Sequence, residues 1–132
     1  MEIDNYQKFW LHYLHEHGRA ETRDLHMAGT GLALLLFAAA AVSLGADPED
    51  RQVSPLALLG AAAVAGYGPA WFGHFFFEKN RPATFQHPLW SLLSELRMTW
   101  MWATGNLNTE LRIAGVQNDV EDASSLLAGA RT

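Results

Sequence analysis

The sequence predicts an all-α membrane protein in which two spanning helices form a hairpin. The chain has 132 residues, and two long stretches of it lack charge, from about 27 to 46 and from about 53 to 77. A polar turn separates the two stretches. Twenty helical residues at a rise of about 1.5 Å per residue cross the roughly 30 Å of a hydrocarbon core. The turn is short and contains Pro48, which makes the two helices antiparallel neighbours. The alternative is a soluble all-helical domain with two buried core helices, and a detergent requirement for extraction would distinguish the two.

The segment before the hairpin predicts an amphipathic helix. At about 100° per residue, one of its faces carries Ile3, Tyr6, Trp10, Tyr13, Leu14 and His17. His12 and His15 fall on the opposite face with charged residues, so we interpret them as surface side chains. Gly18 is typical of a helix end, and a second helix begins soon after it.

After the hairpin, residues 89–103 predict a tryptophan-rich helix at the membrane interface, where indole side chains are favoured. This segment contains the charged residues Glu95 and Arg97, and it is too short to cross the membrane. We expect a single helical membrane domain over residues 1–104. A polar C-terminal tail over residues 105–132 follows, with a short helix and no chemistry of its own.

Charge and composition exclude several classes of function. Nine Lys and Arg against fourteen Asp and Glu give a net charge of -5, and the basic residues are scattered, so nucleic acid is not an expected partner. The chain has no cysteine, which excludes disulfides, thiolate metal sites and a cysteine nucleophile. Basic residues gather at the outer ends of the two spans, and Arg51 is the single one in the turn. Both termini are therefore expected to be cytoplasmic.

Three of the six histidines are expected to meet at one end of the hairpin. An antiparallel pair brings together residues whose numbers average to the centre of the turn, and His26 and His74 average to 50. His17 lies nine residues before His26 across the helix break, so it returns to the same level. Glu78 follows His74 by four residues and projects from the same face of a continuing helix, as a fourth ligand or a base.

Imidazoles with a carboxylate and no thiolate suit iron, zinc, copper or nickel, and with open positions they form the ligand set of non-haem Fe(II) oxygenases. One alternative is a non-catalytic membrane protein whose histidines are interfacial anchors or hold a structural zinc, whose coordination is closed. Another is a metal-dependent lipid hydrolase in which Glu78 acts as the base for a metal-bound water. Such a hydrolase would turn over without oxygen.

Two segments of the chain resemble a known family. Residues 9–29 contain a tyrosine-leucine pair before His17, followed by the pairs Thr22-Arg23 and Leu25-His26 and then Gly29. Residues 73–85 read GHFFFEKNRPATF and carry the most specific part of the resemblance. Together these segments are similar to the small membrane-protein family first catalogued as domain of unknown function 962. The resemblance covers residues 6–104.

The resemblance implies an activity, because fungal members of this family include a 2-hydroxy fatty acid dioxygenase of the endoplasmic reticulum. That enzyme shortens its substrate by one carbon with Fe(II) and molecular oxygen. Carried over residue by residue, the resemblance implies Fe(II) on His17, His26 and His74, with Glu78 at the acidic position of the family. The compact chain looks like the bacterial branch, which implies an integral protein of a bacterial inner membrane.

A fatty acid substrate also requires a group that receives its carboxylate. We expect Lys79 or Arg81 to fill this role. Arg81 suits a carboxylate better, because a guanidinium group can donate two parallel hydrogen bonds to it. The acyl tail is expected to lie between the two spans and the tryptophan-rich helix, which it would enter sideways from the membrane lipid.

Overall fold

The computed structural model describes residues 2–116, and every regular element within that range is helical. The α-helices are α1 (Tyr6–Glu16), α2 (Ala20–Gly45), α3 (Pro55–Phe72), α4 (Pro88–Ala103) and α5 (Leu107–Ile113). Shorter elements lie between them, namely the 3-10 turns η1 (Pro48–Asp50) and η3 (Ala83–Phe85) and the π-helix η2 (Gly73–Glu78). The predicted all-α fold is confirmed.

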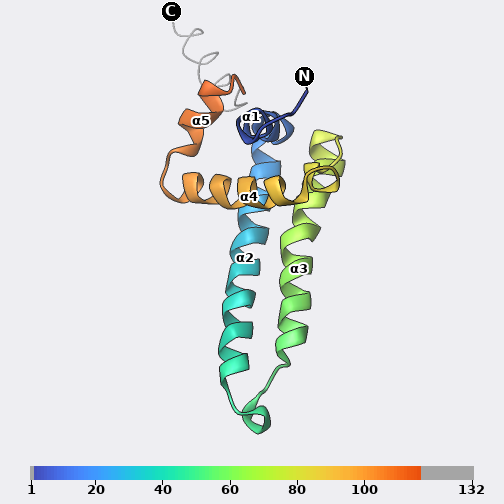
Figure 1. The fold of residues 1–132 in the computed structure, drawn as a ribbon, viewed down its shortest axis with the longest axis vertical. Coiled ribbons are helices and arrows are strands. Elements are labelled where there is room, and N and C mark those ends of the chain that lie inside the picture. The colour runs from blue at the N-terminus through green and yellow to red at the C-terminus, as the bar shows by residue number, and fades with distance from the viewer. Residues whose placement is uncertain (1, 117–132) are drawn as a thin grey trace, which may run out of the picture.

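Helices α2 and α3 form the predicted hairpin and stand side by side along the long axis of the molecule (Figure 1). The helical segments Ala20–Gly45 and Pro55–Glu78 are both long and apolar enough to cross a membrane. Only 22% of the most apolar window of the first and 17% of that of the second are buried within the protein. A core helix of a soluble protein would be mostly buried, so these exposures favour lipid as the surrounding medium.

The ends of the hairpin helices differ slightly from the predicted spans. Helix α2 begins at Ala20, soon after Gly18 as expected, and its polar first turns precede the apolar stretch that begins at about residue 27. Helix α3 begins at Pro55, whose fixed φ and missing N–H suit the first position of a helix. Pro69 lies inside α3, and the π-helix starts at Gly73, four residues later.

The two spans approach each other closely through small residues. A Cβ atom on Gly29 would lie 2.6 Å from the carbonyl oxygen of Ala65, a distance that no side chain tolerates. A Cβ atom on Gly66 would lie 3.6 Å from the Cβ of Ala33, which is ordinary contact. These contacts place residue 33 opposite residue 66 and so fix the register of the hairpin.

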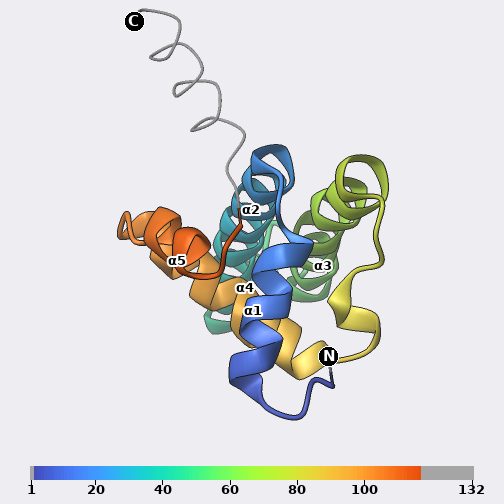
Figure 2. The ribbon, with the colours of Figure 1, turned by 90° about the horizontal axis from the view of Figure 1, so that it is seen from above.

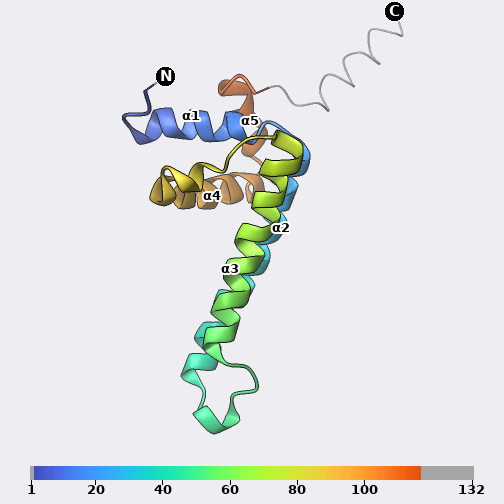
Figure 3. The same ribbon diagram turned by 90° about the vertical axis from the view of Figure 1, so that its right-hand side faces the viewer.

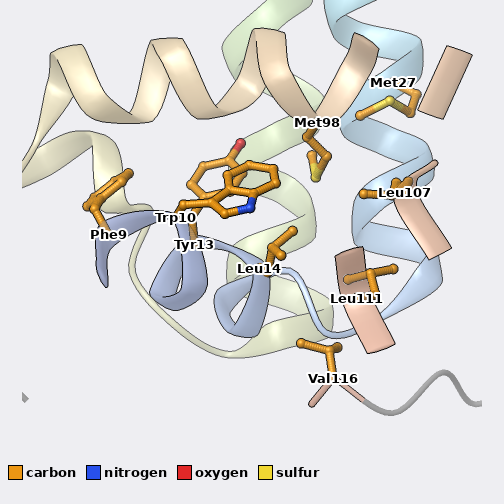
Figure 4. Packing of buried hydrophobic residues seen from close by; sticks show 9 residues of the cluster. All are labelled: Phe9, Trp10, Tyr13, Leu14, Met27, Met98, Leu107, Leu111 and Val116. Atoms are coloured by element: carbon orange, nitrogen blue, oxygen red, sulfur yellow. The ribbon is translucent and has the colours of Figure 1, made fainter. Parts of the chain in front are cut away.

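Helices α1 and α4 project to the same side of the hairpin, one above the other (Figure 3), and α1 crosses over α4 when seen from above (Figure 2). The apolar face predicted for the first helix is buried at Trp10, Tyr13, Leu14 and His17. Helices α1, α4 and α5 together form the head of the molecule. A cluster of nine buried side chains joins the head to α2 (Figure 4): Phe9, Trp10, Tyr13, Leu14, Met27, Met98, Leu107, Leu111 and Val116.

Helix α5 is the short helix expected after residue 105, but it belongs to this core rather than to a polar tail. Leu107 and Leu111 are four residues apart, lie on one face of α5 and are both buried. The indole Nε1 of Trp10 donates a hydrogen bond to Oε2 of Glu110, with 3.0 Å between the two atoms. The rest of the predicted tail, residues 117–132, lies outside the described part of the chain.

Helix α4 lies across the hairpin near the end at which α1 sits (Figure 1). Its bounds agree with the tryptophan-rich helix predicted over residues 89–103. One face of α4 is buried against α1, α2 and α5. The other face exposes a row of large apolar side chains: Leu89, Leu92, Leu93, Leu96 and Trp100. An apolar face on a helix that crosses the spans is typical of an interfacial helix.

Candidate metal centre

Three buried histidines meet where α1, α2 and η2 come together. His17 is the C-cap of α1, His26 lies near the start of α2, and His74 is the second residue of η2. Each offers a ring nitrogen, and these three nitrogens all lie within 4.8 Å of one another. The ring centroids are 4.4 to 5.2 Å apart. The hairpin geometry and the amphipathic face of the first helix therefore predicted which three of the six histidines lie together.

The break between α1 and α2 is held by Arg23, which is itself almost fully buried. Its guanidinium donates hydrogen bonds to the carbonyl oxygens of His17 and Gly18, at 2.8 and 2.7 Å. These bonds satisfy carbonyl groups at the end of a helix that have no partner within it. They also fix the direction in which the chain turns from α1 into α2, and so fix the His17 ring against the hairpin.

The Nδ1 atoms of His17 and His74 both face an oxygen that accepts a hydrogen bond. His17 Nδ1 lies 2.6 Å from the backbone oxygen of Tyr13, and His74 Nδ1 lies 2.8 Å from Oδ1 of Asn80. The amide nitrogen of Asn80 donates to the backbone oxygen of Glu16, so its Oδ1 is the atom left for His74. A backbone oxygen cannot donate a hydrogen bond, so Nδ1 of His17 carries the proton.

The third histidine, His26, has its Nδ1 beside a carboxylate. Nδ1 of His26 lies 2.5 Å from Oε2 of Glu95 on α4. Glu95 also accepts hydrogen bonds from the hydroxyl of Tyr13 at 2.7 Å and from Oγ1 of Thr30 at 2.5 Å. Burial raises the pKa of the Glu95 carboxyl, but the hydrogen bonds from His26, Thr30 and Tyr13 outweigh it, and the net pKa lies below its usual value.

With Nδ1 protonated, a neutral imidazole leaves Nε2 with a free lone pair. Nε2 of His17 lies 3.1 Å from Nε2 of His26. Burial, reinforced by the nearby His26 and His74, lowers the pKa of His17 well below its ordinary value, which keeps this ring neutral and able to bind a cation. Neutral imidazole nitrogens oriented by Nδ1–H hydrogen bonds are the usual ligands of divalent transition metals. The residues present therefore fit a metal ion.

The structure does not bring Glu78 into this cluster. Among the described residues, the group of possible metal ligands consists of the three histidines. Oε1 of Glu78 instead accepts a hydrogen bond of 2.7 Å from the backbone N–H of Arg19. The expectation assumed that an α-helix continues after His74, but the chain adopts a π-helix there. The wider turn of a π-helix points Glu78 in a different direction from His74.

The two basic residues that we expected to receive a carboxylate are exposed at the end of the hairpin. Lys79 caps the π-helix in the left-handed conformation, with φ 56°. Neither Lys79 nor Arg81 lines the cavity beside the cluster. Within the described chain they lie outside the histidine site.

Glu95 is the site residue that sequence reasoning missed. We interpreted it only as a charge that keeps the tryptophan-rich helix out of the bilayer. The signal was its position, because Ser91, Glu95 and Met98 share one face of α4 and the two neighbours are buried. A carboxylate on the buried face of a helix requires partners, and here the partners are His26, Thr30 and Tyr13.

An apolar cavity of about 310 Å³ lies beside the histidines, between α2, α3 and α4. Its lining includes all three histidines at one end and the side chains of Phe37 and Ala62 at the other. Phe37 and Tyr67 are about half exposed, so the cavity opens along the side of the hairpin as a groove. Ser91 also lines it, and the buried hydroxyl of Ser91 has no hydrogen-bond partner within the described protein.

Comparison with protein families identifies the chain. Residues 3–107 match the family model described as 2-hydroxy-palmitic acid dioxygenase Mpo1-like. The chain belongs to this family. The match covers the histidine cluster, the hairpin and α4, and it confirms the resemblance found in the sequence. No curated protein and no solved structure shows a significant match.

The description of the Mpo1-like family names a dioxygenase activity and a 2-hydroxy fatty acid. Both suit the features around the histidines, namely three imidazole ligands for a metal ion and an apolar groove beside them. The family description therefore suggests dioxygenase activity on a 2-hydroxy fatty acid.

Proposed function

We propose that the protein is an Fe(II)-dependent dioxygenase that shortens 2-hydroxy fatty acids by one carbon. The observation that carries the proposal is the convergence of three buried imidazoles at one end of an apolar groove. Iron suits this donor set, because imidazole binds it well and three protein ligands leave positions open. Zinc and copper share the preference for imidazole, and the family description favours a redox metal.

The residues around the groove have different roles in this proposal. His17, His26 and His74 would hold the iron, which supplies redox chemistry with molecular oxygen. Glu95 fixes the ring and tautomer of His26, so that the lone pair of Nε2 points into the cluster. The unpaired hydroxyl of Ser91 is placed to donate a hydrogen bond to the acid head group. The reaction balances without an external reductant, because a 2-hydroxy acid and O₂ give the acid shorter by one carbon, carbon dioxide and water.

Purified protein tests this proposal. Prepared without a histidine tag, it should contain about one iron per chain and consume oxygen with 2-hydroxyhexadecanoic acid, yielding pentadecanoic acid. His26→Ala and His74→Ala should lose the iron, whereas His15→Ala, on the exposed side of α1, should retain it. Tightly held zinc without turnover would instead indicate a structural site. Turnover in the absence of oxygen would indicate a hydrolase.

We further propose that both termini lie on the cytoplasmic side of a bacterial inner membrane, with the histidine end of the hairpin at that face. The basic residues at the outer ends of the spans support this orientation. Because the chain has no cysteine, single cysteines report the side directly. A membrane-impermeant thiol reagent applied to whole spheroplasts should label Glu49→Cys in the hairpin turn and spare Asn108→Cys in α5. The opposite labelling pattern would reverse the orientation.

A further inference from the structure

The far end of the groove lies at a definite distance from the histidines. Phe37 follows His26 by eleven residues on α2, and Ala63 precedes His74 by eleven residues on α3. At about 1.5 Å per residue, each lies about 17 Å along its helix from its histidine. The hairpin register also places Phe37 and Ala63 at the same depth, consistent with the contact between Ala33 and Gly66.

Both residues line the groove, and they differ in size. Phe37 narrows it from α2, whereas Ala63 leaves space for a ligand on α3. Ala63 is exposed rather than packed between the spans, so a larger side chain there would enter the groove without displacing the partner helix.

The chemistry of the groove specifies its occupant as a single extended acyl chain. Its middle is lined by apolar side chains of both spans, such as Leu34, Ala62 and Gly66. Its polar groups gather at the histidine end, where Ser91 has an unpaired hydroxyl. An amphiphile with one polar head and one linear tail matches this division. The open side of the groove allows it to enter from the lipid.

We infer that Phe37 and Ala63 set the length of acyl chain that the protein accepts, an inference that rests on the proposed function. Carbon single bonds of about 1.5 Å advance an extended chain by about 1.3 Å per carbon. The groove therefore takes about thirteen carbons beyond a head group held at the histidines. An acid of about fifteen carbons fits, close to the palmitic chain in the family description.

Two opposite substitutions test the inference, each with a matched control on the same helix. Ala63→Phe fills about one helical turn of the groove and should shift the preferred acid to a chain about four carbons shorter. Ala61→Phe makes the same change on the opposite face of α3, since Ala61 is exposed and does not line the groove. Phe37→Ala should shift the preference to longer acids. Leu35→Ala, at an exposed position of α2 outside the groove, is its control.

The measurement is a length profile of 2-hydroxy acids from ten to twenty carbons in lipid nanodiscs, by oxygen consumption and by competitive binding of the unreacted acids. For Ala63→Phe we expect kcat/KM for the sixteen-carbon acid to fall roughly ten-fold or more, the discrimination that an over-long chain meets in an apolar pocket. The twelve-carbon acid should retain its wild-type value, and both controls should keep the wild-type profile.

The two readouts separate the inference from the proposed function. Shifted binding profiles without oxygen consumption by any variant would uphold the groove and refute the dioxygenase. Oxygen consumption with a profile that neither Ala63→Phe nor Phe37→Ala moves would refute the length determinants and uphold the enzyme. A shift produced equally by Ala61→Phe would also refute them, because the effect would then not come from the groove.

Discussion

Replacing Glu95 with glutamine should weaken metal binding without unfolding the protein. The carboxylate accepts hydrogen bonds from His26, Tyr13 and Thr30, and its side chain is only 17% exposed. Glutamine keeps the shape and one acceptor oxygen but removes the charge. Alanine would leave three buried donors unpaired at about 1 to 3 kcal/mol each, which confounds metal loss with misfolding.

The size of the effect follows from the contacts. Nδ1 of His26 donates to Oε2 of Glu95, and a charged acceptor at this position makes the ring a stronger ligand. Removal of such a partner costs 10- to 100-fold in metal affinity, or about 1.4 to 2.7 kcal/mol. If the amide nitrogen turned toward His26 instead, the ring would adopt the other tautomer and block Nε2.

Chelator competition for Fe(II) under anaerobic conditions measures the affinity directly. Glu110→Gln is the matched control, because Glu110 also accepts a hydrogen bond from an aromatic residue of α1, Trp10, but has no contact with the histidines. Glu95→Gln with wild-type affinity would refute the role of Glu95. An equal loss in Glu110→Gln would show that the effect acts through the fold of the head.

Three other predictions concern the packing, the titration and the placement of single residues. Gly29→Ala should lower hairpin stability by about 1 to 3 kcal/mol, because the added Cβ meets the Ala65 carbonyl oxygen at 2.6 Å, whereas Gly31→Ala, with open space around it, should not. The lowered pKa of His17 means that the unfolded chain takes up a proton below about pH 6.5 that the folded chain refuses. Stability of the metal-free protein should therefore fall by up to about 1.4 kcal/mol per pH unit below that value, visible in thermal melts and reduced in His17→Gln. Glu78→Gln should retain the full metal content by elemental analysis, since this carboxylate lies outside the cluster.

The hairpin and its histidines were predictable because they depend on local features of the sequence, namely the apolar stretches, the turn and helical periodicity. Two uncharged stretches and a short turn determine an antiparallel pair, and the pair determines that His26 and His74 share a depth. The 100° periodicity of the first helix then distinguished His17 from His12 and His15. None of these inferences requires knowledge of which helix packs on the head.

The partners of the histidines were not predictable, because they depend on tertiary packing. His26 and Glu95 are separated by 69 residues, and they meet only because α4 lies back across the hairpin. The direction of α4 is set in turn by the core under α1, to which α5 contributes Leu107 and Leu111. Glu78 illustrates the converse, since local periodicity placed it correctly for an α-helix that the chain does not form.

The candidate metal centre also connects α1 with the two spans. His17 belongs to the head, whereas His26 and His74 belong to the two spans, so one ion would tie all three elements together. Binding of that ion would therefore be coupled to docking of α1 onto the hairpin. Because α1 also covers α4 and Tyr13 lines the groove, the same docking would complete the substrate site.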